Sequence, residues 1–351
     1  MKKVLVVLGA LVLLGGGAAG WLYWSTGKKV DAFERTPFGG RAPVTVVIPS
    51  GTNPVGVGIL LARAHVISSA STWHLWLRWR KLAPRMKAGE YEFTGPATPP
   101  QLVQKMVKGE VKLHHFTVAE GLRCDEIMPI IAASDLGLDK ATLLALCTDK
   151  AFARAHGVPG DRLEGYLFPD RYSFPMNVSE AQVVAAMIAR AKAEYAKASA
   201  HRGPGIKLNM NQAFTLASII EKETGNADER AHISCLFHNR LKRHIKLQTD
   251  PTVLYGMFVK TGTFDRDLAF HGFVAAREDQ NAYNTYVIDG LPKGPIANPG
   301  RAALDAALAP SACDDLFFVA DGTGRHVFCP NVACHEKAVA HYVATLHAHA
   351  K

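Results

Sequence analysis

The chain has 351 residues, of which 48% are hydrophobic and 20% are charged, so it holds enough apolar material for a globular core. This composition excludes a disordered or fibrous chain. The formal charge of +9 would suit a polyanion or an anionic membrane, but over this length it is weak evidence, and six cysteines are too few for a disulfide-built scaffold.

The N-terminal segment, residues 1–24, predicts a membrane anchor preceded by a short charged stub. The run from Val4 to Trp24 has no charged residue, and about 20 apolar residues suffice to cross a bilayer. A cleavable signal peptide is the alternative, because small residues at 15–20 follow a short apolar stretch. Aromatic residues near Trp24, typical of a membrane interface, favour the anchor. Either interpretation exports the remainder, and the polar residues 25–40 predict a tether.

Residues 41–110 predict a small α+β module. Its expected elements are a strand at 44–48, helices at 54–64 and 71–82, a strand at 89–93 and a helix at 99–108. Trp73 and Trp76 stand at helical spacing, a pattern more typical of a core than of a sugar-stacking platform.

Residues 111–351 predict a larger, mixed α/β domain, so the whole chain is expected to be of the α+β class. The pattern indicates a strand at 112–118, a turn and a short helix at 125–133. The remaining expected elements are helices at 142–147, 183–200, 211–224 and 228–243, a strand at 316–320 and a hairpin turn at 321–324.

The helix at 211–224 carries the clearest chemical candidate. Glu221 lies on the same face as Phe214 and Ala217, and loss of water around a carboxylate raises its pKa, as a general acid requires. Periodicity alone also allows Glu221 to be a surface residue of a frayed last turn. Glu223 falls on the other side of the helix and is expected to face solvent.

Two polar loops and a cysteine cluster follow. The loops at 247–252 and 283–300 combine polar, aromatic and proline residues, a composition suited to binding sugars, although Asp-Pro is also ordinary turn chemistry. Cys329 and Cys334 precede His335, but no second ligand pair has zinc spacing, so inert thiols or one disulfide are expected among Cys313, Cys329 and Cys334, and no metal. Nucleophile-elbow, P-loop, zinc-protease and dinucleotide-binding motifs are absent from the sequence. Glycoside and phosphoester chemistry both stay open on these residues alone.

Several ordered motifs resemble those of the YceG-like (MltG-like) endolytic murein transglycosylases of the bacterial inner membrane. The matching segments are Val118–Gly121, Leu163–Asp170, Leu216–Thr224, Asn239–Leu241, Leu247–Thr252, Tyr283–Tyr286, Gly290–Pro292, Asn298–Gly300 and His326–Phe328. Lys293 departs from the pattern, because a proline is common there.

The resemblance implies a lytic transglycosylase that cleaves the β-1,4 bond between N-acetylmuramic acid and N-acetylglucosamine inside a strand. Glu221 would be the catalytic acid, and no cofactor would be needed. Residues 41–110 would form a LysM-like subdomain, the N-terminus would be cytoplasmic, and the catalytic domain would be periplasmic. The expected partners are peptidoglycan glycan strands and the inner membrane, with a peptidoglycan synthase as a further candidate and no nucleic acid.

Supporting roles follow from the same motifs. Substrate-binding or supporting side chains are expected at Gln248, Asp250, Asn284, Tyr286, Asn239 and Arg240. Glu164 and Asp170 are interpreted as structural. Two alternatives stay open: Asp250 as a second catalytic carboxylate would make the protein a lysozyme-like hydrolase, and a non-catalytic protein would hold glycan for the synthesis machinery.

Overall fold

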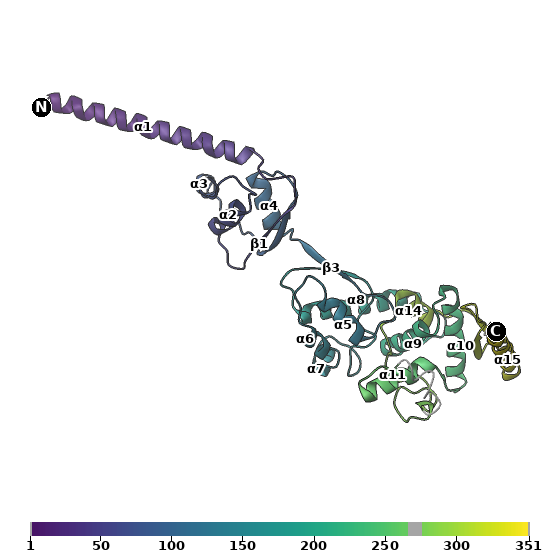
Figure 1. The fold of residues 1–351 in the computed structure, drawn as a ribbon. Helices are drawn as coiled ribbons and strands as arrows, with labels where there is room; N and C mark the ends of the chain where they lie inside the picture. The colour runs from purple at the N-terminus through teal and green to yellow at the C-terminus, as the bar shows by residue number, and fades with distance from the viewer. Residues whose placement is uncertain (1, 266–275, 350–351) are drawn as a thin grey trace. The chain divides into compact units, whose positions relative to one another are not determined.

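The structure is a computed structural model that describes residues 2–265 and 276–349, with side chains described for 13–265 and 276–345 (Figure 1). The chain divides into two compact units. The first holds Met1–His114 with Phe174–Asn177, and the second holds His115–Ser173 with Val178–Lys351. The small sheets and many helices confirm the mixed α+β class at this coarse level.

The first unit packs helices against a two-stranded antiparallel sheet. Its elements are α1 (Lys2–Arg35), β1 (Val44–Ile48), α2 (Pro54–Arg63), α3 (Ala70–Trp79), β2 (Gly89–Phe93) and α4 (Pro99–Lys108). β1 and β2 pair antiparallel, with Val44 opposite Phe93 and Ile48 opposite Gly89. The expected strands and helices of this module are confirmed to within a few residues.

The tryptophans of α3 belong to the core of this unit. Trp73 is 0% and Trp76 is 1% exposed, which confirms core packing over a sugar-stacking platform. The indole of Trp73 donates to the Pro54 carbonyl at 2.8 Å. α2 and α3 approach closely at Gly58, where an added Cβ would lie 2.3 Å from the Trp73 ring. Glycine at this position is therefore required by packing.

The predicted tether differs from the structure over its first half. α1 continues to Arg35, and Val30 is completely buried in the core of the first unit. The Arg80 guanidinium binds Asp31 and Glu34, so this end of α1 is also held by ion pairs. Residues 25–35 are therefore an integral part of the first unit.

The side chains of residues 1–12, which include the start of the predicted anchor, lie outside those described. Among the described residues, no helix combines the length and the apolar character that a membrane span requires.

The second unit is mostly helical. β3 (Leu113–Thr117) pairs with β4 (Arg171–Pro175). The helices are α5 (Cys124–Ala132), α6 (Lys140–Leu146), α7 (Lys150–Ala155), α8 (Glu180–Ala200), α9 (Met210–Glu223), η1 (Ala227–Glu229), α10 (Arg230–Lys242), α11 (Asp250–Thr261), α14 (Arg301–Leu308) and α15 (Val332–His349). β5 (Phe317–Ala320) and β6 (His326–Cys329) form an antiparallel hairpin, as the turn at 321–324 predicts.

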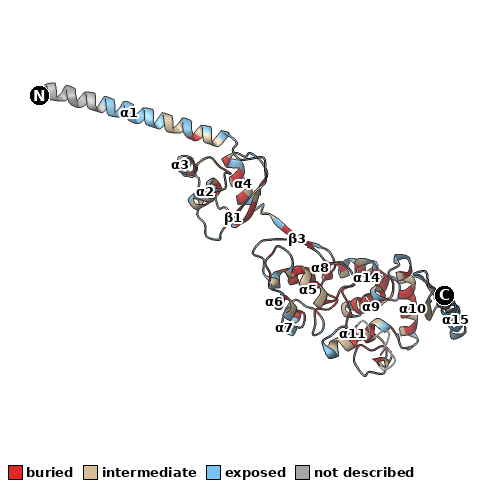
Figure 2. Cartoon of the chain, in the orientation of Figure 1, coloured by how far each residue is buried: buried red, intermediate tan, exposed pale blue. Residues whose placement is uncertain are grey.

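The central element of this unit is α9. Its residues Ala213–Ile220 are all buried, and Figure 2 shows the buried colour along this helix. α9 packs against α14, α10 and α11. The Asn209 side chain accepts from the Gln212 backbone at 2.9 Å, and the Gln212 side chain accepts from the Asn209 backbone, so a capping box starts the helix. A helix buried all round places its two ends, not one face, at the surface of the unit.

All six cysteines are paired. The disulfides join Cys124 to Cys147, Cys235 to Cys313, and Cys329 to Cys334. Within the cluster of Cys313, Cys329 and Cys334 the expected single disulfide forms between Cys329 and Cys334, whereas Cys313 is bonded to Cys235 outside the cluster. Cys124 begins α5 and Cys147 directly follows the neighbouring helix α6, a proximity that their spacing in the chain does not reveal.

Candidate active site

A cavity of about 340 Å³ lies at the C-terminal end of α9. Its lining combines polar and aromatic side chains. The polar side chains come from the end of α9, from α10 and from the two loops named above: Glu223, Arg240, Gln248, Thr249, Asp250 and Tyr286. The aromatic side chains come from α10, β5 and α15: Phe237, Phe317, Phe318 and His335. Rings together with hydrogen-bonding groups suit a sugar, whose ring has apolar faces and hydroxyl edges.

Glu223 is the last residue of α9 and is partly buried in this cavity. Burial, helped by the Asp250 carboxylate, raises the pKa of Glu223 to about 7, whereas Thr249 and Arg240 act in the opposite direction. The expectation that Glu223 faces solvent is wrong. Helical periodicity places it away from Glu221, but the loop at 247–250 covers that side of the helix end.

Glu221 lies elsewhere, among buried structural contacts. One carboxylate oxygen accepts from the Gly300 backbone at 3.0 Å, and the other lies 3.4 Å from Arg230 Nη2. Its side chain is 7% exposed and is not among the residues that line the cavity. Burial, and then the charge of Glu221, raise the pKa of the neighbouring Glu120. Glu221 thus ties the end of α9 to the start of α14.

Asp250 and Tyr286 are oriented by direct contacts. The Tyr286 hydroxyl donates to Asp250 Oδ1 at 2.6 Å, and Arg277 Nη2 donates to the same oxygen at 3.1 Å. The Arg277 guanidinium also stacks on the Tyr286 ring, 4.5 Å from its centroid. Asp250 begins α11, so the predicted loop ends one turn earlier than expected.

Gln248 is exposed into the cavity, and its backbone has a φ of +51°, a strained conformation for a residue other than glycine. Arg240 supports this conformation, because its Nη1 donates to the carbonyls of Lys246 and Leu247 at 3.0 and 2.9 Å. Thr249 is held by its backbone donating to the Thr285 hydroxyl at 2.9 Å. Arg240 therefore shapes the wall as well as lining it.

Two predicted binding residues have structural roles instead. Asn284 is completely buried, and its amide donates to the carbonyls of Ala276, Arg277 and Asp279. Asn239 donates to the carbonyls of Cys313 and Asp315. Neither lines the cavity, because the Asn284 amide satisfies the backbone of its own loop and the Asn239 amide on α10 satisfies the backbone of the segment before β5.

Sequence reasoning missed Glu223, Thr249 and the aromatic side chains, His335 among them. The second glutamate of the Glu-Lys-Glu-Thr segment was a visible signal, since it stands at the helix end where a loop can cover it. Three of the four aromatic residues, Phe317, Phe318 and His335, come from segments roughly 90 to 110 residues beyond Glu223, which periodicity cannot place.

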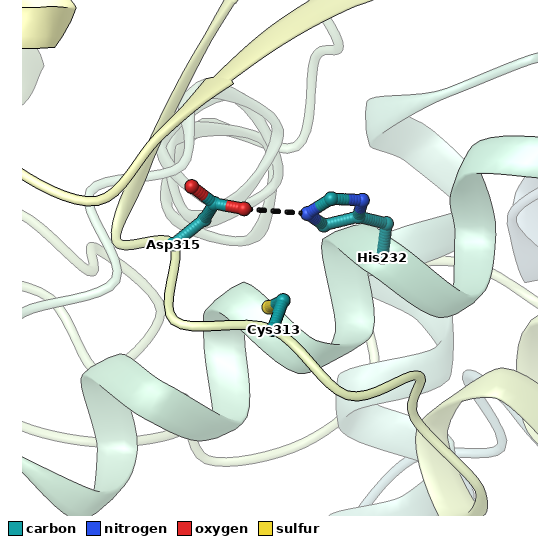
Figure 3. Close-up of side chains that lie close together, drawn as sticks. All are labelled: His232, Cys313 and Asp315. Atoms are coloured by element: carbon teal, nitrogen blue, oxygen red, sulfur yellow. Dashed lines mark hydrogen bonds and ion pairs between the residues drawn. The ribbon is translucent and has the colours of Figure 1, made fainter.

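A second cluster joins His232, Cys313 and Asp315 (Figure 3), whose ligand-type atoms lie within 4.8 Å of one another. His232 Nε2 and Asp315 Oδ2 are 2.7 Å apart. Cys313 is bonded to Cys235, so it has no thiolate to offer a metal. The cluster does not fit a metal site in this state; it links α10 to the strand that leads into β5.

The sequence pattern that defines the YceG-like family matches residues 46–341, which include the whole cavity. The chain belongs to the YceG-like family. A relative from Bacillus subtilis (strain 168), named endolytic murein transglycosylase, is 30% identical to this YceG-like chain over 87% of it and 86% of the relative. A protein of the same name from Streptococcus pneumoniae (strain D39) is 27% identical over 95% of this chain, which spans 63% of that longer protein.

A solved structure agrees with this membership. The crystal structure of a putative YceG-like protein from Listeria monocytogenes is 31% identical to this chain and superposes with a TM-score of 0.53 over 85% of it and 99% of the other chain. The YceG-like fold thus extends over both units.

Proposed function

We propose that this protein is an endolytic murein transglycosylase in which Glu223 is the acid and base. The observation that carries the proposal is a carboxyl group with a pKa of about 7 in a cavity lined by both aromatic and hydrogen-bonding side chains. A group with this pKa is protonated often enough to act as an acid and ionised often enough to act as a base at neutral pH.

The reaction needs only one such group. Glu223 protonates the glycosidic oxygen between N-acetylmuramic acid and N-acetylglucosamine. The resulting carboxylate then takes the proton of the muramoyl C6 hydroxyl, which attacks C1 and closes a 1,6-anhydro ring. Water is not consumed, so no second carboxylate has to activate it, unlike in a hydrolase.

The neighbouring residues have positioning roles in this scheme. Gln248, whose side chain makes no hydrogen bond among the described residues, is placed to bind a sugar acetamide or hydroxyl. Asp250, held by Tyr286 and Arg277, presents a fixed acceptor to the same sugar. Arg277 Nη2 also donates to Asp250 Oδ2 at 3.4 Å, so both carboxylate oxygens have a partner, and this arrangement supports a positioning role for Asp250.

The product distinguishes this reaction from its alternatives. We expect the full-length protein to cut purified glycan strands internally and to leave 1,6-anhydromuramoyl ends, detected by mass spectrometry. Reducing ends, heavier by one water, would instead indicate a hydrolase with Asp250 as second carboxylate. Binding of strands without cleavage would support the non-catalytic scaffold.

We further propose a single-pass inner-membrane protein with the second unit in the periplasm and the first unit as a LysM-like module. The uncharged run Val4–Trp24 and three disulfides, which persist in oxidising compartments, support this location. The protein should remain in the membrane fraction after a high-salt wash, and protease added to spheroplasts should degrade the second unit. Salt release or protection from protease would contradict this.

A further inference from the structure

A second cavity of about 250 Å³ lies at the other end of α9, within the second unit. Asn211, the second residue of α9, lines it, whereas Glu223 at the last position lines the candidate active site. Twelve residues separate them, which corresponds to about 18 Å along the helix axis. One rigid, buried helix thus sets the distance between the two cavities.

The rim of this cavity is positively charged. Lys150 and Lys293 both lie 3.4 Å from Asp161 Oδ2, and their side chains are 63% and 58% exposed. The two ammonium groups therefore share a single carboxylate, so the rim keeps a net positive charge. Lys293 is also the position where a proline is common in the resembling proteins.

Arg162 adds a third cation with no partner of its own. It is partly buried in the cavity wall, and within the described part of the chain no hydrogen bond or ion pair involves its guanidinium. The Tyr283 hydroxyl, on the same wall, also makes no hydrogen bond among the described residues. A partly desolvated guanidinium and a hydroxyl left without acceptors favour an oxyanion.

Glu164, a buried carboxyl that also lines this cavity, feels the charge of Arg162, but its oxygens are occupied by other donors. Its Oε1 accepts from the Cys124 backbone at 3.0 Å and from Asn298 Nδ2 at 2.9 Å, and its Oε2 accepts from the Tyr255 hydroxyl at 3.2 Å. Burial raises the pKa of Glu164 to about 7, so it carries only part of a negative charge near neutrality. With Asp161 shared, the cavity keeps an excess of positive charge.

We propose that this cavity binds a carboxylate of the murein peptide stem, with Arg162 and Tyr283 as direct donors and Lys150 and Lys293 at the rim. The proposal rests on the proposed function, which supplies a substrate with such stems. A carboxylate matches the planar guanidinium fork. Because α9 sets the spacing, a stem held here fixes which glycosidic bond reaches Glu223.

The test compares glycan strands that carry stems with strands stripped of stems by an amidase. Binding is measured with the full-length Glu223→Gln variant, so that strands are not consumed. We expect stem-bearing strands to bind more tightly, and Arg162→Gln in this background to weaken their binding about ten-fold while leaving stripped strands unaffected. Asp161→Asn should have the opposite effect. It should increase the affinity for stem-bearing strands roughly two- to five-fold, because it removes the carboxylate that both lysines contact.

Two further measurements keep the outcome interpretable. Arg154→Gln makes the same charge change at an exposed position of α7 outside the cavity and should alter neither affinity. The double variant Lys150→Gln with Lys293→Gln, at exposed positions, covers the case in which Arg162→Gln does not fold.

Equal binding of the two kinds of strand, or equal weakening of both by the charge variants, would overturn the proposal. Stem-dependent binding by a protein that cleaves no strand would overturn the proposed reaction and leave this site standing. Competition by inorganic phosphate with no preference for stem-bearing strands would assign the cavity to phosphate and overturn the stem carboxylate.

Discussion

Glu223→Gln is expected to lower the rate of strand cleavage by about 10²- to 10⁴-fold, the usual contribution of a general acid or base. Glutamine keeps the shape of the side chain but can neither donate the proton to the leaving oxygen nor accept one from the C6 hydroxyl. The variant should fold at least as well as the wild type above pH 7, because burial raises the pKa of Glu223 and so disfavours the charged form there. Single-turnover cleavage and thermal unfolding at pH 8 measure the two effects.

Glu221→Gln is the matched control, since it makes the same change two residues away. It leaves the Arg230 guanidinium without its carboxylate, so the main effect should be a lower unfolding temperature, with a smaller loss of cleavage per folded molecule. If Glu221→Gln abolishes cleavage and Glu223→Gln does not, the acid is Glu221, as the motif resemblance implies.

The pH profile gives independent evidence on the same group. Since the first step needs protonated Glu223, the single-turnover rate should fall as the pH rises through about 7. A rate that stays constant from pH 5 to pH 9 would contradict this role.

Asn298→Ala is expected to destabilise the protein by about 3 kcal/mol or more. Asn298 is completely buried; its amide donates to the Leu122 carbonyl and to Glu164 Oε1, both at 2.9 Å, and its carbonyl accepts from the Leu167 backbone at 2.8 Å. Alanine would leave the buried Leu167 backbone N–H without this partner, and it would remove one of the hydrogen bonds accepted by the Leu122 carbonyl and one of those accepted by Glu164 Oε1. Urea denaturation measures the free energy of unfolding.

The control for this prediction is Asn331→Ala. Asn331 is exposed and accepts one hydrogen bond, from the Cys334 backbone at 3.0 Å, so its loss should cost about 1 kcal/mol, as for other helix caps. A similar cost for both variants would show that Asn298 does not join these segments in the way proposed.

Much of the local structure of this protein is determined by the sequence itself. The alternation at 44–48 and 89–93, the capping residues before the helices, and the apolar run at 213–220 specify their elements from near neighbours alone. The same kind of pattern identified α3 as a core helix. The motifs also located the two loops that contribute to the candidate active site, although much of the loop at 283–300 is buried in the structure.

The roles of individual site residues were decided by the tertiary structure. Periodicity could distinguish the two faces of α9, but only the loop that carries Gln248 and Asp250 decides which of the two glutamates lines the cavity. Asparagine is a common residue type in binding sites, yet the side-chain amides of Asn284 and Asn239 donate to backbone carbonyls of the protein itself. The carbonyls bound by Asn239 come from a segment more than 70 residues away in the chain. A local sequence pattern therefore cannot predict whether a polar side chain binds a ligand or another part of the same protein.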